Sequence, residues 1–195
     1  MKRPGRGTWM IVLGVLLVIA DQIIKVLVKT GMSLGETIYV AGEWFQLHFV
    51  LNKGMAFGMA FGGVTGKVLL SLFRLCLFAA LFWWIGKLAR KQSTPIGVLV
   101  GLTLIAAGAL GNIIDCFFYG LVWPETIMPG APFPFMFGQV VDMFYFPLFT
   151  YRLPQILGGG TRVFFDAVFN FADSCVTCGA FYLLFFQYRF FAKEE

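Results

Sequence analysis

The sequence predicts an all-α membrane protein: four transmembrane helices with a small extracytoplasmic β-rich surface region and a long outer loop. Of the 195 residues, 59% are hydrophobic and only 13% are charged, whereas about a quarter of the residues in a soluble domain are charged. Several apolar runs approach the ~20 residues that cross a bilayer core as a helix. The basic residues are scattered beside these runs, so the net charge of +5 indicates topology signals and no nucleic-acid partner. We expect one integral membrane domain over residues 1–195.

The first span is expected at about residues 9–28. The basic residues before it imitate a signal peptide, but the apolar run meets Asp21 and Gln22 and then resumes. A signal peptide would instead end in a small-x-small cleavage site, so we expect an uncleaved span. Asp21 and Lys25 are four residues apart and share one face of this helix. A buried ion pair that ties helices together is favoured there over a direct catalytic role for Asp21.

Residues 30–66 have a different character. Every second residue from Phe45 to Leu51 is apolar, a period that predicts a strand, here lying on the membrane surface. His48 alternates away from the apolar side, so we expect a solvated strand position and not a ligand. One histidine cannot build the usual zinc site, and we expect no metal and no cofactor. A glycine-rich turn follows from Asn52.

Two further spans are expected at about residues 68–85 and 96–118, joined by a basic loop. Gly108, Asn112 and Asp115 are spaced at i, i+4 and i+7, which places them on one face of the third span. This face is polar and lies near the far end of the span.

The region 119–168 is rich in proline, which excludes a long helix. Aromatic residues between positions 133 and 146 suggest a loop that rests on lipid headgroups. A fourth span is expected at about residues 172–191. We therefore interpret 119–168 as the long outer loop between the third and fourth spans.

Basic residues predict the orientation. Those beside the spans fall on one side, which the positive-inside tendency assigns to the cytoplasm. Both termini are then cytoplasmic, and both long loops, 30–66 and 119–168, lie outside. Lys53, Arg152 and Arg162 do not follow this pattern.

The four cysteines lie in or beside the predicted spans and do not form a disulfide framework. Cys175 and Cys178 have the spacing of a redox motif. The apolar helix around them has no soluble redox fold, so small-residue helix packing is favoured over a redox or metal role.

Two carboxylates lie at the edges of apolar segments, where a charge is costly. Asn170 is a good helix N-cap, and Asp173 three residues later completes an arrangement like a capping box. The helix dipole there favours an ionised Asp173. Asp142 follows two valines at a predicted strand end, a poorly solvated place that favours protonation. Such a pair can act as one acid–base unit and hydrolyse an amide without a covalent intermediate.

Other interpretations of these residues stay open. Asp173 could only cap its helix while Asp142 sits in a solvated loop. Intramembrane carboxylates also mark ion pathways, so a small transporter or proton carrier is the alternative function, although no inverted repeat is visible. A non-enzymatic scaffold would explain the packing glycines but not the carboxylate pair.

The chain resembles the lipoprotein signal peptidases, also called signal peptidase II. The resemblance covers essentially the whole chain and rests on five motifs that occur in order: Asp21-Gln22-Ile23-Ile24-Lys25; Asn52-Lys53-Gly54-Met55-Ala56-Phe57; Gly108 with Gly111-Asn112-Ile113-Ile114-Asp115; Val140-Val141-Asp142; and Phe169-Asn170-Phe171-Ala172-Asp173.

The resemblance implies that Asp142 and Asp173 are the catalytic dyad of an aspartic endopeptidase in the bacterial cytoplasmic membrane. The residues that match positions supporting the site or the substrate are Asp21, Lys25, Asn52, Gly54, Gly108, Asn112, Asp115, Asn170 and Ala172. The implied substrate is a diacylglyceryl prolipoprotein, cut just before its lipidated cysteine. The other implied partners are membrane lipids, and the enzyme is expected to be a monomer with its active site near the outer face.

The sequence departs from the family pattern in two respects. Members usually have arginine where this chain has Cys116, so a contact made by that arginine is missing. Arg74, inside the second span, is expected to snorkel outward or to pair, and it could replace that arginine. The connections from Asp115 to Asp142 and from Asp142 to Asp173 are also longer than in most members.

Overall fold

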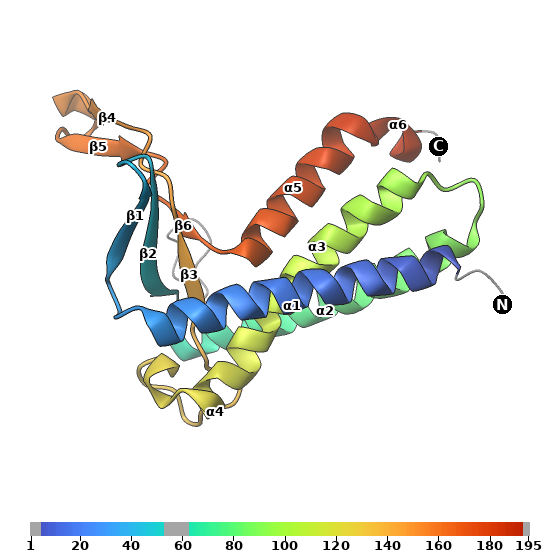
Figure 1. Cartoon of the computed structure of the whole chain (residues 1–195), viewed down its shortest axis with the longest axis horizontal. Coiled ribbons are helices and arrows are strands. Elements are labelled where there is room, and N and C mark those ends of the chain that lie inside the picture. The colour runs from blue at the N-terminus through green and yellow to red at the C-terminus, as the bar shows by residue number, and fades with distance from the viewer. Residues whose placement is uncertain (1–4, 53–62, 193–195) are drawn as a thin grey trace.

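A computed structural model describes residues 5–52 and 63–192 (Figure 1). Its body is made by three long helices: α1 (Arg6–Gly31), α2 (Gly63–Arg90) and α3 (Ile96–Ile114). The first two are long and apolar enough to cross a membrane, and so is the third together with its continuation to Val122. Three of the expected spans are therefore present as helices.

The third helical segment ends later than expected. Beyond α3 it continues through a π-helical turn, η1 (Asp115–Tyr119), into α4 (Gly120–Val122). A short 3₁₀ turn, η2 (Pro124–Thr126), then begins the loop that leads to the sheet. Single π turns inside α-helices are frequently found at functional sites, and this one begins at Asp115.

The last helix is shorter than a membrane span. The apolar helix α5 (Phe171–Phe186) has 16 residues, below the ~20 that cross the hydrocarbon core. The chain breaks at Gln187 before the short α6 (Tyr188–Phe191). The fourth span at 172–191 therefore stays a prediction.

Helix α3 is the centre of the bundle. Val98, Leu99 and Leu102 are among its buried side chains, in a core cluster with residues of α1, α2 and α5. Helix α5 approaches α3 closely because glycines line the contact. A Cβ atom on Gly101 would lie 2.6 Å from Leu183 Cδ2, and one on Gly108 would meet the carbonyl oxygen of Ala172. These glycines leave room for the backbones of α3 and α5 to pack closely.

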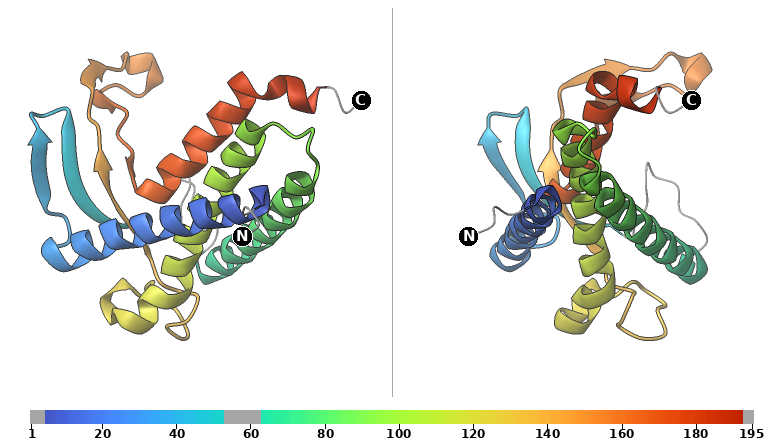
Figure 2. Two further views of the ribbon diagram at one scale, coloured as in Figure 1. Left: turned by 45° about the vertical axis from the view of Figure 1, so that its right-hand side comes forward. Right: turned by 90° about the vertical axis from the view of Figure 1, so that its right-hand side faces the viewer.

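Strands from both long loops form one antiparallel sheet at one end of the bundle (Figures 1 and 2). Its order is β1-β2-β3-β6. The strands are β1 (Thr37–Ala41), β2 (Phe45–Asn52), β3 (Val140–Tyr145) and β6 (Val168–Phe169). The predicted strand at 45–51 is confirmed. The region 119–168 is not a plain loop, because β3 lies within it and β6 begins at its end.

The region between β3 and β6 adds a separate hairpin. Strands β4 (Phe149–Arg152) and β5 (Thr161–Phe164) pair with each other, with the 3₁₀ turn η3 (Gln155–Leu157) in the connection between them. Figure 2 shows this hairpin beyond β6, on the opposite side of the sheet from β1.

The strict alternation expected for β2 is broken. The pairing of β2 with β3 shifts register between Leu47 and Val50, so the buried residues are Gln46 and Phe49, three positions apart. A bulge of this kind inserts an unpaired residue and re-aims the side chains beyond it. His48 lies in this strand and is only partly exposed, and its Nδ1 contacts Thr37 Oγ1 at 2.7 Å.

Several aromatic residues at 133–146 pack against other rings of the protein. Phe146 stacks on Phe45 at 4.7 Å between ring centroids, and it also stacks on Phe169. Phe137 is buried, whereas Phe133 is exposed. Contact of the exposed rings with lipid headgroups stays a prediction.

Candidate active site

Asp142 lies inside the sheet. It is the third residue of β3 and pairs with Val50 of β2, so the expectation that it ends a strand is wrong: β3 continues to Tyr145 because β2 and β6 both supply pairing partners. Its side chain is 1% exposed, which excludes a solvated loop position. Both carboxylate oxygens accept hydrogen bonds, Oδ1 from Asn170 Nδ2 (2.6 Å) and Oδ2 from Asn52 Nδ2 (2.9 Å).

Asp173 begins helix α5 in the predicted capping box. The backbone N–H of Asp173 donates to Asn170 Oδ1 (2.9 Å), and the backbone N–H of Asn170 donates to Asp173 Oδ2 (3.4 Å). The remaining oxygen, Oδ1, accepts from Asn112 Nδ2 (2.8 Å). Asp173 is half-buried, so the two carboxylates differ in their exposure to water. The capping box is confirmed, and the same residues also tie Asp173 to α3.

Asn170 connects the two carboxylates. Its Oδ1 receives the N–H of Asp173, a donor-only group, so its Nδ2 must point the other way, toward Asp142. Asn112 is oriented in the same manner. Its Oδ1 accepts from Lys25 Nζ (3.0 Å) and Asn170 Nδ2 (3.1 Å), and this leaves its own Nδ2 for Asp173. The donor-only ammonium of Lys25 therefore fixes the amide that holds Asp173.

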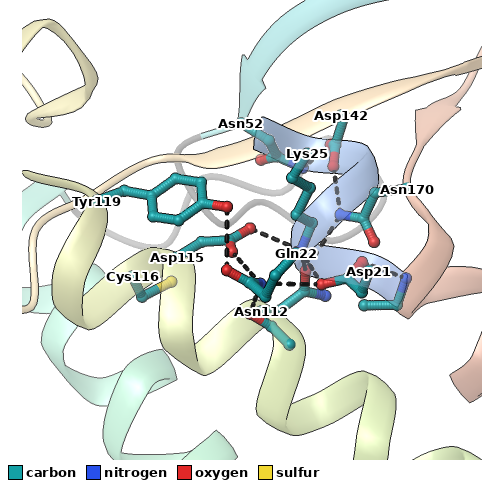
Figure 3. A network of polar contacts seen from close by, with 12 residues as sticks. Asp21, Gln22, Lys25, Asn52, Asn112, Asp115, Cys116, Tyr119, Asp142 and Asn170 are labelled. Atoms are coloured by element: carbon teal, nitrogen blue, oxygen red, sulfur yellow. Dashed lines mark hydrogen bonds and ion pairs between the residues drawn. The ribbon is translucent and has the colours of Figure 1, made fainter. Parts of the chain in front are cut away.

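Lys25 is the centre of a second, deeper cluster (Figure 3). Its Nζ lies 2.9 Å from Asp21 Oδ2 and 2.7 Å from Asp115 Oδ2, and all three side chains are at most 2% exposed. Asp21 Oδ1 also accepts the backbone N–H of Ala172 (2.9 Å). The predicted ion pair between Asp21 and Lys25 is confirmed, and it joins α1 to α3 and to the start of α5.

Two members of this cluster were missed from the sequence. Gln22 donates through Nε2 to Asp115 Oδ1 (3.0 Å), and its Oε1 accepts from the hydroxyl of Tyr119 (3.1 Å). Gln22 follows Asp21 directly, so its position in the motif was the available signal. Tyr119 lies four residues after Asp115, in the π-helical turn that the sequence did not predict.

The environment of Asp142 changes its acidity. Its pKa is raised from 3.8 to about 7, chiefly by burial and secondly by the nearby charge of Asp173, while hydrogen bonds from Asn52 and Asn170 act in the opposite direction. Asp142 can therefore hold a proton close to neutral pH. When one carboxyl group is buried and its neighbour is half-exposed, their pKa values differ, so one can act as the acid and the other as the base.

The described residues include no group of three or more histidine, cysteine or acidic side chains that could hold a metal ion. The hydrogen bonds of the site show two carboxylates held by asparagine amides. Of the residues expected around it, only Gly54 lies outside the described ranges. Gly108 and Ala172 form the backbone contact between α3 and α5 that brings Asn112 to Asp173.

Comparison with known proteins identifies the family. The sequence model described as signal peptidase (SPase) II matches residues 13–189. The chain belongs to the signal peptidase II family. It is 43% identical to the lipoprotein signal peptidase of Porphyromonas gingivalis, over 94% of this chain and 84% of that protein. The lipoprotein signal peptidase of Amoebophilus asiaticus is 37% identical, over 86% of this chain and 72% of that protein.

Two solved structures share the fold. Both are described as bacterial membrane enzyme structures obtained by the in meso method. One has a TM-score of 0.64 at 22% identity and covers 96% of this chain and 92% of its own. The other has a TM-score of 0.59 at 24% identity, with coverages of 91% and 90%. The signal peptidase II family is a family of aspartic proteases, so the chain is assigned to the hydrolases.

The Cys116 position, where signal peptidases II usually have arginine, is surrounded by cations from α2. Lys67 Nζ lies 3.2 Å from Cys116 Sγ, and Arg74 Nη1 lies 3.7 Å from it. Of the two outcomes expected for Arg74, snorkelling outward or pairing, the structure shows an inward contact. Lys67 was missed, although its spacing of seven residues from Arg74 places both on one face of α2. Two basic groups thus reach the position of the missing arginine.

Proposed function

We propose that this chain is a lipoprotein signal peptidase in which Asp142 and Asp173 act together on the scissile peptide bond. The observation that carries the proposal is that Asn170 hydrogen-bonds both carboxylates. Its contact with Asp173 fixes the orientation of its side-chain amide, and the amide Nδ2 then donates to Asp142. The substrate would be a diacylglyceryl prolipoprotein, cleaved just before its lipidated cysteine.

The different environments of the two carboxylates support an assignment of roles. Asp173 is half-buried and takes a proton from the attacking water. Asp142 is buried, with a pKa of about 7, and gives a proton to the carbonyl oxygen as water adds to the carbonyl carbon. The tetrahedral intermediate then collapses: the C–N bond breaks, and the cysteine nitrogen leaves as an amine after it receives the proton that Asp173 took. The proton on the second hydroxyl returns to Asp142, and the signal peptide leaves with a new carboxyl group.

The remaining polar residues support the dyad in this proposal. Lys25 pairs with Asp21 and Asp115 and orients Asn112 toward Asp173. Asn52 donates a hydrogen bond to Oδ2 of Asp142. Gly54, from the same motif as Asn52, is proposed for the substrate side on the strength of the family resemblance alone. No cofactor is needed for this chemistry.

The proposal includes a topology. Four spans would place both termini in the cytoplasm and residues 30–66 and 119–168 outside the bacterial cytoplasmic membrane. The basic residues at the end of α2, such as Arg90, support this orientation, and the sheet with Asp142 lies at the opposite end of the bundle (Figure 1). The active site would then face the outer surface, and the enzyme would act as a monomer.

The test is a cleavage assay with purified protein and two forms of one prolipoprotein, with and without the diacylglyceryl group. We expect the lipidated form alone to lose the mass of its signal peptide. The unlipidated form is the matched control for the proposed specificity. Absence of cleavage by folded enzyme would overturn the proposal and would leave the transporter alternative, which a proton-flux measurement in vesicles would then examine.

A further inference from the structure

The β4–β5 hairpin has two chemically different faces. Its register pairs Phe149 with Phe164, Thr150 with Val163, Tyr151 with Arg162, and Arg152 with Thr161. Cross-strand partners share a face, and successive pairs alternate between faces. One face therefore carries Phe149, Tyr151, Arg162 and Phe164, and we call these four residues the aromatic face. The opposite face carries Thr150, Arg152, Thr161 and Val163.

The aromatic face is uncovered by the described part of the chain. Phe149 and Phe164 stack at 4.7 Å between ring centroids, with an interplanar angle of 6°, yet they remain 56% and 47% exposed. Tyr151 is 43% exposed, and Ile156 in the turn at the tip is 88% exposed. Single exposed apolar residues are ordinary, but a contiguous group marks an interaction surface.

The charge on the hairpin indicates the partner. Arg152 and Arg162 are exposed, and neither forms an ion pair or a side-chain hydrogen bond with any described residue. Asp166, the one acidic residue between β3 and β6, accepts instead from the hydroxyl of Tyr145 (2.8 Å). Unpaired arginines beside exposed aromatic rings suit a lipid surface, where the rings sit at headgroup level and arginine binds phosphate.

The position of the hairpin brings it to such a surface. It lies at the sheet end of the bundle, beside the four-stranded sheet (Figures 1 and 2). Helices that cross the bilayer hold this end of the protein at the membrane surface at all times. Since docking of the hairpin is then intramolecular, a weak interaction is sufficient to keep it there.

We propose that the β4–β5 hairpin binds the bilayer surface at the sheet end of the protein, with its aromatic face and Ile156 among the headgroups and Arg162, on that face, on anionic lipid phosphate. This would also explain why Arg162 does not follow the positive-inside pattern: it contacts lipid and does not set topology. The inference is independent of the proposed catalysis, because it concerns neither carboxylate.

The experiment uses the full chain in nanodiscs. A polarity-sensitive fluorophore is attached to Gln155→Cys, next to Ile156, after the exposed Cys76 and Cys178 are replaced by serine. In discs of phosphatidylcholine with phosphatidylglycerol, we expect emission at shorter wavelength and quenching by nitroxide-labelled lipids. In discs of phosphatidylcholine alone, both effects should be smaller. A label that reports water in both compositions would overturn the proposal.

Charge and apolar contributions are separated by variants. Arg162→Gln should lower the ratio of docked to undocked hairpin in anionic discs about fivefold, from roughly 1 kcal/mol for a basic residue near an anionic surface. The matched control, Arg90→Gln, removes one exposed charge at the end of α2 and should leave the label unchanged. Ile156→Ser should reduce docking in both compositions. Equal effects of Arg162→Gln and Arg90→Gln would contradict the role of Arg162.

A protein partner is the competing outcome. If the label stays in water in all discs but becomes protected when prolipoprotein is added, the hairpin binds polypeptide and the lipid proposal is wrong. Activity is not the readout in any arm, so failure of the proposed peptidase function would leave this test intact.

Discussion

Two groups of carboxylates lie close together in this protein, and they differ in whether a cation pairs with them. Asp21 and Asp115 share the ammonium of Lys25 and are sealed from solvent. Asp142 and Asp173 have no cation within ion-pair distance among the described residues and are held by amide groups of asparagines. The first group, here called the satisfied group, has a cation partner, which suits a supporting role. The second group keeps its basicity, which is what proton transfer requires.

The largest effect is expected from removing the cation of the satisfied group. Lys25→Met should lower stability by about 3–5 kcal/mol, because it leaves two buried carboxylates without their cation. The matched control is Lys29→Met, whose partner Glu125 is 58% exposed, so that loss of this ion pair should change stability far less. Thermal unfolding in detergent measures both. Similar losses for the two variants would mean that the Lys25 cluster is not a buried ionic core.

Neutralising one acid in each group should separate stability from activity. Asp21→Asn removes charge from the satisfied group, so it should lower the folded yield more than the turnover of each folded molecule. Asp142→Asn should do the reverse. The check is the amount of monodisperse protein compared with the activity per folded molecule. A variant of Asp21 that folds normally and is inactive would move Asp21 into the catalytic group.

Stability should also respond to pH through Asp142. Its folded pKa of about 7 exceeds the unfolded value of 3.8, so folding favours the protonated form. This contribution is fully present below pH 3.8 and is lost as pH rises to about 7. Asp142→Asn lacks this loss, so its melting temperature relative to the parent should increase between pH 4 and 7. A constant difference across this range would mean that Asp142 is not desolvated in the folded protein.

The smallest effect is expected from the cysteines. All four are free thiols, and none contacts either carboxylate of the dyad. Replacing Cys116 by serine retains an acceptor for Lys67, and alanine at the other three positions should leave cleavage measurable. Complete loss of activity in the folded quadruple variant would reveal a thiol function.

Helix spacing and capping patterns predicted the contacts of the site between residues that are close in sequence. The spacing of Asp21 and Lys25 predicted their ion pair, and the spacing of Asn170 and Asp173 predicted the capping box. The face shared by Asn112 and Asp115 was also correct. Each of these contacts lies within one or two helical turns, where the backbone geometry alone decides which side chains meet.

The contacts between distant segments were not predictable in the same way. Asp142 was expected at a strand end, because nothing near it in sequence reveals that β2 pairs across the whole of β3. The bulge in β2 likewise depends on that partner strand and buries Gln46 in place of an apolar neighbour. The inward turn of Lys67 toward Cys116 depends on how α2 packs against the π-helical turn. These features come from tertiary pairing, which overrides local periodicity.

The central claim is that Asp142 and Asp173 work as one catalytic unit. The most direct measurement compares prolipoprotein cleavage by Asp142→Asn, Asp173→Asn and the double variant, each in folded and substrate-binding form. General acid–base assistance contributes roughly 10²–10⁴-fold, and groups that act as a unit lose activity non-additively. We therefore predict that each single variant loses cleavage by at least that range and that the double variant is no worse. Near-normal cleavage by either single variant, or losses that multiply in the double variant, would contradict the account.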